Sequence, residues 1–278
     1  MRRACVIGWP VEQSRSPLIH GYWLNKYGIE GAYTKEAVRP EAVAGFLKSL
    51  AANGYVGCNV TLPHKEAAFA AADEREECAL AVAAANTLWL AGGKLCAANT
   101  DTYGYMTHLK LAAPGWDARD APVSILGAGG TARAIAFGFL KAGVGEVRVF
   151  NRTRARAEAL AEHFGPRVKV LDWSERETRS REAAVLVNTT SIGMNGVGTL
   201  DIDFSGFDPA CIVSDVVYVP LLTELLARAR ARGLRTVDGL GMLLHQAVPG
   251  FERWFGVRPE VTDELKSILL ADIAGRKC

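Results

Sequence analysis

Short apolar segments alternate with amphipathic segments along almost the whole chain, and this alternation limits the fold more than any other feature. VSILG at 123–127 is typical of a buried strand, TARAIAFGFLKAG at 131–143 of a helix, and EVRVF at 146–150 of the next strand. Consecutive parallel strands need a crossover connection, which is usually a helix. The pattern therefore predicts an α/β protein built on parallel sheets.

Both halves of the chain show this alternation. In the first half we expect strands at 3–8, 31–38 and 55–60, helices at 16–28, 40–54, 65–72 and 101–113, and a hairpin at 86–99 that turns at Gly92 and Gly93. The breaker-rich segment 113–122 follows, and we expect the domain seam near it. In the second half we expect a helix at 154–165, strands at 183–190 and 211–217, and C-terminal helices at 242–256 and 259–275.

The charge balance and hydropathy argue against two classes of partner. Thirty-two basic and 30 acidic side chains give a net charge of +2, so we expect no nucleic-acid partner. No stretch reaches the roughly 18 uncharged apolar residues of a membrane span, and Gly8 and Pro10 come too early for a signal peptide. We therefore expect no membrane association.

The cysteines and histidines indicate neither disulfides nor a metal. The six cysteines form no CxxC pair and mostly lie in apolar segments, at positions 5, 58, 78, 96, 211 and 278. This pattern is typical of buried free thiols in a reducing cytoplasm. The five histidines have no metal-ligand spacing, so we expect no metal site.

A glycine-rich loop joins the predicted strand at 123–127 to the next helix. It supplies Gly127-x-Gly129-x-x-Ala132, in which the first glycine permits the tight turn and the second lets the backbone approach a pyrophosphate. The small third residue lets the helix pack on the strand, and the helix N-terminus faces the phosphates. In this strand–loop–helix–strand setting, the loop predicts a dinucleotide site.

The segment NRTRAR at 151–156 favours NADP over NAD. An NAD site usually has an acidic residue about 20 positions past the loop, which binds the ribose 2′-hydroxyl. Here, past the end of the second predicted strand at Phe150, the first acidic residue is Glu158, whereas Arg152, Arg154 and Arg156 could each pair with a 2′-phosphate. The alternative is a solvated basic helix start, which the helix dipole disfavours.

A lysine stands where a predicted strand passes into a helix. In NVTLPHK, residues 59–65, Pro63 keeps Leu62 extended and suits the start of the helix, so Lys65 lies at the strand–helix junction. Side chains at such junctions point into the clefts of α/β proteins. A lone lysine there is also typical of a solvated surface, so its interpretation depends on the rest of the chain.

Nine segments in order resemble the shikimate dehydrogenase family: IGWPVEQSRSPLIH, NVTLPHK, AANTL, NTDTYG, GAGGTARA, NRT, NTTSIGM, DVVY and DGLGMLLHQ. They run from about residue 6 to residue 246. The resemblance implies an N-terminal α/β substrate domain, 1–103, completed by C-terminal helices, 240–278, and a doubly wound Rossmann domain, 104–239. It also implies NADPH-dependent, reversible reduction of 3-dehydroshikimate to shikimate, in aromatic biosynthesis. The sequence leaves open whether the protein is a monomer or a homodimer.

The resemblance also implies roles for individual residues. Lys65 and Asp101 would be the catalytic pair, and the substrate would be bound by Ser14, Ser16, Asn59, Thr61, Asn86, Tyr218 and Gln246. NADP would be bound by Gly127, Ala128, Gly129, Gly130, Thr131, Asn151, Arg152, Thr153, Arg154 and Arg156, with Val216, Gly239 and Met242 around the nicotinamide. Glu77 matches a position that is sometimes near the cofactor.

The chemistry of ketone reduction fits these residue types. A lysine ammonium can stabilise and protonate the developing alkoxide, and an aspartate beside it offsets the cost of burying its charge. Short polar side chains suit a small anionic substrate that is rich in hydroxyl groups. Two alternatives remain at this point: Ser16 before Pro17 is a good helix N-cap, and Asn86 and Asn99 are also typical turn residues.

Three other functions are compatible with the same segments. The nearest is a dual quinate/shikimate dehydrogenase with a roomier pocket and some tolerance of NAD. A second is a paralogue that acts on a modified ring. The third, from a different class, is a catalytically silent NADP-binding sensor, against which the intact Lys65 and Asp101 argue.

Overall fold

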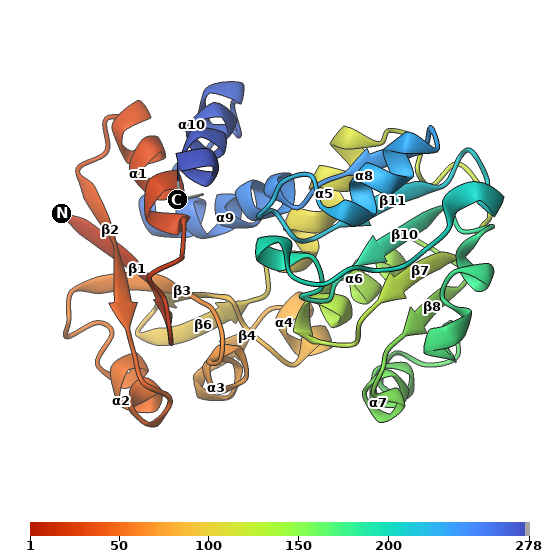
Figure 1. Ribbon diagram of the computed structural model, residues 1–278. Coiled ribbons are helices and arrows are strands. Elements are labelled where there is room, and N and C mark those ends of the chain that lie inside the picture. The colour runs from red at the N-terminus through yellow and green to blue at the C-terminus, as the bar shows by residue number, and fades with distance from the viewer. Residues whose placement is uncertain (276–278) are drawn as a thin grey trace. The chain divides into compact units, whose positions relative to one another are not determined.

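The computed structural model describes residues 1–275, and the chain divides into two compact units (Figure 1). The first contains Met1–Asp101 together with the chain from Leu244 onward, and the second is Thr102–Leu243. Residues 276–278, and with them the predicted free thiol of Cys278, lie outside the described residues.

The first unit is built on a mixed sheet in the order β2-β1-β3-β5-β6-β4. Strands β1, β2 and β3 are parallel, whereas β5 runs antiparallel to both β3 and β6. The strands are β1 (Arg2–Gly8), β2 (Gly31–Ala37), β3 (Tyr55–Val60), β4 (Glu74–Arg75), β5 (Thr87–Ala91) and β6 (Lys94–Ala98). The predicted hairpin is β5–β6, and its turn uses positive φ at Gly92 and Gly93.

Helices cover both faces of this sheet. Helices α1, α9 and α10 lie on one face, and α2 and α3 lie on the other (Figure 1). The helices are α1 (Ser16–Lys26), α2 (Val43–Lys48), α3 (Lys65–Ala71), α4 (Glu77–Val82), α9 (Leu240–Phe255) and α10 (Asp263–Gly275). Helix α9 belongs to this unit from Leu244 onward.

Helix α9 packs closely on the sheet because β3 carries a glycine beneath it. A Cβ atom on Gly57 would lie 2.2 Å from Nε1 of Trp254, which donates a 2.9 Å hydrogen bond to the carbonyl of Leu88. Trp254 is also fully buried next to His20 and Tyr33. The chain from Leu244 is therefore part of the core of the first unit.

The second unit is built on a parallel sheet in the order β12-β11-β10-β7-β8-β9. The strands are β7 (Val123–Leu126), β8 (Val147–Phe150), β9 (Val168–Leu171), β10 (Val185–Asn188), β11 (Ile212–Asp215) and β12 (Arg235–Val237). In chain order this is the 3-2-1-4-5-6 arrangement of the doubly wound dinucleotide-binding fold. The predicted α/β fold class is confirmed.

Helices flank this sheet as well. Helices α5 and α8 lie on one face and α7 lies on the other (Figure 1). The helices are α5 (Asp101–Ala112), α6 (Gly130–Lys141), α7 (Arg154–Phe164) and α8 (Glu224–Ala231). Helix α5 starts at Asp101, the last residue of the first unit before the chain passes into the second.

The structure contains elements that the sequence analysis does not predict. Strands β9 and β12 are short edge strands with alternating polar residues, and α8 is a short helix with several arginines, so none carries a strong apolar signal. The breaker-rich segment 113–122, expected near the seam, instead connects α5 to β7 inside the second unit, where Trp116 packs on Phe139. Its buried indole makes this loop part of the core.

The described residues contain neither a membrane-spanning helix nor a cluster of metal-ligating side chains. Between residues 1 and 275, no helix is both long enough and apolar enough to cross a membrane. Over the same residues, no three His, Cys, Asp or Glu side chains gather as a metal site would require. The absence of a metal from the working protein stays a prediction.

Candidate active site

Lys65 and Asp101 form an ion pair at the carboxyl ends of strands in the first unit. Lys65 is the first residue of α3, after the turn that follows β3, and Asp101 begins α5 shortly after β6. The Lys65 Nζ donates a 2.6 Å hydrogen bond to Oδ2 of Asp101. The side chain of Lys65 is 24% exposed and that of Asp101 is 10% exposed, so the pair is largely desolvated.

Asn86 binds the other oxygen of this carboxylate. Its Nδ2 donates a 2.8 Å hydrogen bond to Oδ1 of Asp101, while its Oδ1 accepts one of 2.8 Å from the backbone N–H of Thr100. A backbone N–H can only donate, so the amide orientation is unambiguous. Asn86 is therefore more than a turn residue, because it fixes the carboxylate on which Lys65 depends.

Asn59 lies on β3, opposite the residue that follows Asn86 in the neighbouring strand β5. Its Oδ1 accepts a 2.6 Å hydrogen bond from the hydroxyl of Tyr33, and its Nδ2 donates at 3.2 Å to the carbonyl of Asn86 and at 3.2 Å to Oγ1 of Thr87. Tyr33, Thr87 and Thr100 were not identified from the sequence. The sequence marks Thr87 and Thr100 only by their positions, directly after the asparagines of AANTL and NTDTYG.

The turn between β3 and α3 is fixed by its own backbone and by a buried histidine. The N–H of Thr61 donates to the carbonyl of Ile7, and the N–H of His64 donates to the carbonyl of Thr61. The His64 Nε2 lies 2.6 Å from the carbonyl oxygen of Val38. The turn is thus tied to β1 and to the end of β2, which gives Lys65 a rigid base.

Ser14 and Ser16 lie at the start of α1, and the capping interpretation of Ser16 is wrong. The helix has Arg15 at its N-cap, and no side chain makes a capping hydrogen bond. The oxygen of Ser14 instead accepts a 3.3 Å hydrogen bond from the N–H of Ser16. Arg15 pairs with Asp272 of α10 at 2.8 Å, which ties this segment to the C-terminal helix.

The other candidates of the first unit lie on different elements. Gln246 is half-buried on α9, and Glu77 is the exposed first residue of α4. Both make interactions within the protein.

The glycine-rich loop of the second unit has the geometry of a phosphate site. Gly127 has φ +111, and a Cβ there would lie 2.5 Å from Oγ1 of Thr189, so only glycine fits. Cβ atoms on Gly129 and Gly130 would instead meet nothing within 4 Å, which leaves open space above the N-terminus of α6. Ala132 is fully buried, as close packing of helix on strand requires.

The three arginines after β8 differ in their partners. Arg154 is engaged, since its Nε pairs with Glu158 at 2.8 Å and a terminal nitrogen lies 3.7 Å from Asp172. Arg152 and Arg156 are exposed, and within residues 1–275 neither guanidinium makes an ion pair. Asn151 donates to the carbonyl of Thr153, which stabilises the turn into α7. Arg152 and Arg156 are thus available to an anion.

A buried aspartate organises the candidates at the end of β11. Asp215 accepts hydrogen bonds from the N–H of Val217, the hydroxyl of Thr223 and the amide of Asn188. Burial raises the pKa of the Asp215 carboxyl to about 6, and these three hydrogen bonds oppose the shift. The carboxylate thereby holds the loop that carries Val216 and Tyr218.

Gly239 and Met242 follow β12 in the same unit. A Cβ on Gly239 would lie 2.2 Å from the carbonyl oxygen of Val216, so this residue must be glycine for the two loops to meet. Met242 is buried in the main core cluster of the unit, against which Val216 also packs. Val216 and Gly239 are therefore neighbours, and Met242 belongs to the core cluster on which Val216 packs.

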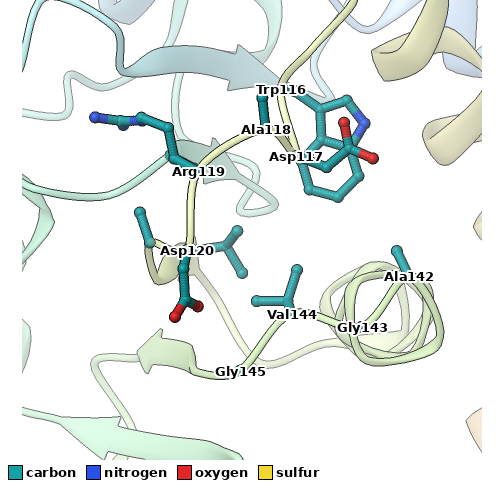
Figure 2. Close-up of a pocket in the computed structure, with 12 residues that line it drawn as sticks. Trp116, Asp117, Ala118, Arg119, Asp120, Ala142, Gly143, Val144 and Gly145 are labelled. Atoms are coloured by element: carbon teal, nitrogen blue, oxygen red, sulfur yellow. The ribbon is translucent and has the colours of Figure 1, made fainter.

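A separate pocket of about 230 Å³ lies at the other end of the strands of this sheet. Figure 2 shows the loop from Trp116 to Asp120 on one side and the turn from Ala142 to Gly145 on the other. Val123, the first residue of β7, lines it, so it lies at the amino ends of the strands, whereas Gly127 lies at their carboxyl ends. None of the predicted site residues lines this pocket.

Sequence comparison identifies the family. The shikimate dehydrogenase substrate binding domain matches residues 6–88, shikimate/quinate 5-dehydrogenase matches 110–197, and the shikimate 5′-dehydrogenase C-terminal domain matches 239–263. A shikimate dehydrogenase (NADP(+)) from Azorhizobium caulinodans is 53% identical over 276 residues, which cover 99% of this chain and 98% of the relative. This chain belongs to the shikimate dehydrogenase family. The resemblance of the nine segments is thereby confirmed.

Solved structures related to the shikimate dehydrogenase family share the fold over nearly the whole chain. Shikimate 5-dehydrogenase from Thermus thermophilus, in complex with NADP(H) and shikimate, is 36% identical to this chain with a TM-score of 0.85. The match covers 99% of each chain. Quinate dehydrogenase from Corynebacterium glutamicum, in complex with NAD, is 30% identical with a TM-score of 0.88 and covers 96% of this chain and 98% of its own. Members of this fold therefore differ in both ring substrate and cofactor.

Proposed function

We propose that this chain is an NADP-dependent shikimate dehydrogenase, which catalyses the reversible reduction of 3-dehydroshikimate to shikimate. The observation that carries the proposal is the Lys65–Asp101 pair, in which Asn86 binds the second carboxylate oxygen. A silent binding protein would gain nothing from a desolvated ion pair of this kind, because such pairs contribute little to stability. The family membership supplies the substrate class.

Lys65 acts on the oxygen of the substrate. Its ammonium has three donors, of which Asp101 accepts one, so others remain for a substrate oxygen. As the ring ketone becomes an alkoxide, the ammonium stabilises the growing negative charge and then transfers a proton to the oxygen. Asp101 holds the ammonium in position and, in the reverse direction, assists the return of the proton to Lys65.

The second unit provides residues that fit NADP. When bound, NADPH supplies the hydride that converts the ketone to a secondary alcohol. The open space at Gly129 and Gly130, together with the N-terminus of α6, suits the pyrophosphate. The unpaired Arg152 and Arg156 suit the 2′-phosphate, and Val216, Gly239 and Met242 would border the nicotinamide.

The remaining side chains would bind the substrate. In this proposal Ser14 and Ser16 bind its carboxylate, while Asn59, Thr61, Asn86, Tyr218 and Gln246 contact or border the ring hydroxyls. The reaction would take place in the cytoplasm, which the free thiols of Cys5, Cys58, Cys78, Cys96 and Cys211 support. The oligomeric state, monomer or homodimer, stays open.

A single assay tests the proposed function. The purified protein should reduce 3-dehydroshikimate with NADPH, and more slowly or not at all with NADH. Reduction of 3-dehydroquinate should be measured beside it, because a quinate dehydrogenase bound to NAD shares the fold. Equal turnover of both rings would establish the dual enzyme, and absence of turnover with an intact fold would establish a silent binding protein.

Replacing Ser14 and Ser16 together by alanine should mainly raise KM. Two neutral donors would be lost, each worth about 0.5–1.5 kcal/mol, so we expect a KM increase on the order of 10-fold. The carboxylate does not react, so its hydrogen bonds are similar in the ground and transition states and kcat should change little. Steady-state kinetics with shikimate as the varied substrate provides the measurement.

The matched control replaces two other serines of the same unit, the half-buried Ser49 and the exposed Ser267, by alanine. Its KM should equal that of the wild type. If the Ser14/Ser16 variant melts at a lower temperature without any change in KM, these serines are structural, and they do not bind substrate.

A further inference from the structure

Thr87 is a fully buried polar residue in the sheet of the first unit. It is the first residue of β5, opposite Asn59 of β3 and Ala98 of β6. Its side chain has no exposed surface. Burying a hydroxyl costs free energy unless hydrogen bonds compensate, so a threonine here requires a specific use of its oxygen.

The hydroxyl of Thr87 lies at the centre of a hydrogen-bond network. It accepts a 3.2 Å hydrogen bond from Nδ2 of Asn59, lies 3.2 Å from the hydroxyl of Thr100, and donates at 3.1 Å to Oδ1 of Asn86. The hydroxyl and the backbone N–H of Thr100 donate to the same Oδ1. Three donors therefore surround the oxygen end of the Asn86 amide.

The donors and acceptors of this network are set at Asn59, which contacts both Tyr33 and the backbone carbonyl of Asn86. Tyr33 donates to Asn59, and burial holds the pKa of the Tyr33 phenol well above its usual value, so the phenol keeps its proton. The Tyr33 ring stacks on His20 with centroids 4.0 Å apart, and burial lowers the pKa of His20 to about 3, which keeps that ring neutral. Nδ2 of Asn59 also donates to the backbone carbonyl of Asn86, which can only accept, so Asn59 presents its amide nitrogen to Thr87 and its oxygen to Tyr33.

We infer that Thr87 is a positioning residue for the reaction. Its hydroxyl, oriented by Asn59, holds the oxygen of Asn86 and thereby turns the Asn86 amide nitrogen toward Asp101, which in turn holds Lys65. In the described residues no hydrogen bond joins Thr87 to Lys65 or Asp101, so Thr87 acts through Asn86. This inference rests on the proposed function for its kinetic readout and on the hydrogen bonds for its geometry.

Replacing Thr87 by valine tests the inference, because the side chain keeps its shape and loses only the hydroxyl. We expect kcat/KM for 3-dehydroshikimate to fall about 10-fold, since one buried hydrogen bond and the order of the network are lost. Thr87→Ser, which keeps the hydroxyl, should stay within about threefold of the wild type. Thr34→Val, the same change on β2 of the same sheet, should have no effect.

The double variant Thr87→Val/Asn86→Ala distinguishes positioning from general stability. If Thr87 acts through Asn86, the valine should cost little in a protein that already lacks the Asn86 amide. The inference is overturned if valine costs the same factor in both backgrounds, if Thr87→Ser is as impaired as Thr87→Val, or if Thr87→Val keeps more than about half of kcat/KM. Should the valine variant fail to fold, Thr87→Ala beside Thr87→Ser makes the same comparison.

A wild-type protein inactive on both ring ketones would refute the proposed function. The positioning inference would then be tested by crystal structures of the wild type and of Thr87→Val. In Thr87→Val the hydrogen bond from Nδ2 of Asn86 to Oδ1 of Asp101 should lengthen, because only Thr100 then holds the amide oxygen of Asn86. An unchanged Asn86–Asp101 hydrogen bond in the valine variant would overturn the inference.

Discussion

Replacing Lys65 by alanine should lower kcat at least ~100-fold while KM changes only severalfold. The ammonium matters mainly as negative charge builds on the substrate oxygen, so its loss affects the transition state more than substrate binding. Loss of a positioned general acid typically costs about 10²–10⁴-fold, or roughly 3–5 kcal/mol of barrier. The measurement is steady-state kinetics on the purified variant, with its fold checked by circular dichroism and its NADPH affinity by fluorescence titration.

The matched control for Lys65 is Lys94→Ala. Lys94 also forms a 2.6 Å ion pair, with Glu74, but its side chain is 59% exposed and lies at the start of β6. Its kcat should equal that of the wild type. If the folded Lys65→Ala protein keeps more than about a tenth of wild-type kcat, Lys65 is a solvated lysine and has no role as general acid.

Asp101→Ala should be impaired to a similar degree, and its KM should also rise because Asn86 loses the acceptor that holds its amide nitrogen. The Lys65/Asp101 double variant should lose much less than the product of the two single losses, since both side chains serve one proton transfer. A double variant whose loss equals that product would show that the two residues act independently.

Replacing Arg152 and Arg156 together by alanine should lower the affinity for NADP at least ~10-fold and leave NAD turnover nearly unchanged. Hydrogen bonds to charged groups contribute about 1.5–3 kcal/mol each, and the lower end applies here because both guanidinium groups are exposed. NAD lacks the 2′-phosphate, so it loses nothing. Titration with each cofactor measures the selectivity directly.

The control for this variant must remove the same two positive charges elsewhere in the unit. Arg228 and Arg232 are suitable, because they form surface ion pairs with Asp201 and Asp203. Their double alanine variant should bind NADP normally. An equal loss of NADP and NAD affinity in the Arg152/Arg156 variant would mean that these arginines do not recognise the 2′-phosphate.

The sequence alone predicted those features that local residue patterns encode. The alternation of apolar strands and helices predicted the α/β fold, because its periodicity is a local property. The glycine at position 127 predicted the phosphate loop. The structure has φ +111 there, a value available almost only to glycine. Lys65 was located at a strand–helix junction from Pro63 and the residues around it.

Only the tertiary structure decided which side chains are partners. Arg154 looks like its neighbours in sequence, yet Glu158 and Asp172 engage it, and Ser16 looks like a helix cap but makes no capping hydrogen bond. Strands β9 and β12 form at the sheet edges because a neighbouring strand offers hydrogen bonds, although their own residues give little apolar signal.

The orientation of Asn86 illustrates the physical reason. Its amide is fixed by Thr100 and Asp101, which follow it by 14 and 15 positions, and the hydroxyl that orders its oxygen is held by Asn59, which lies 28 positions before Thr87. Hydrogen bonds between strands depend on sheet register, and register is set by the packing of the whole unit. A single sequence specifies which residues can donate and accept, and only the folded sheet decides which of them meet.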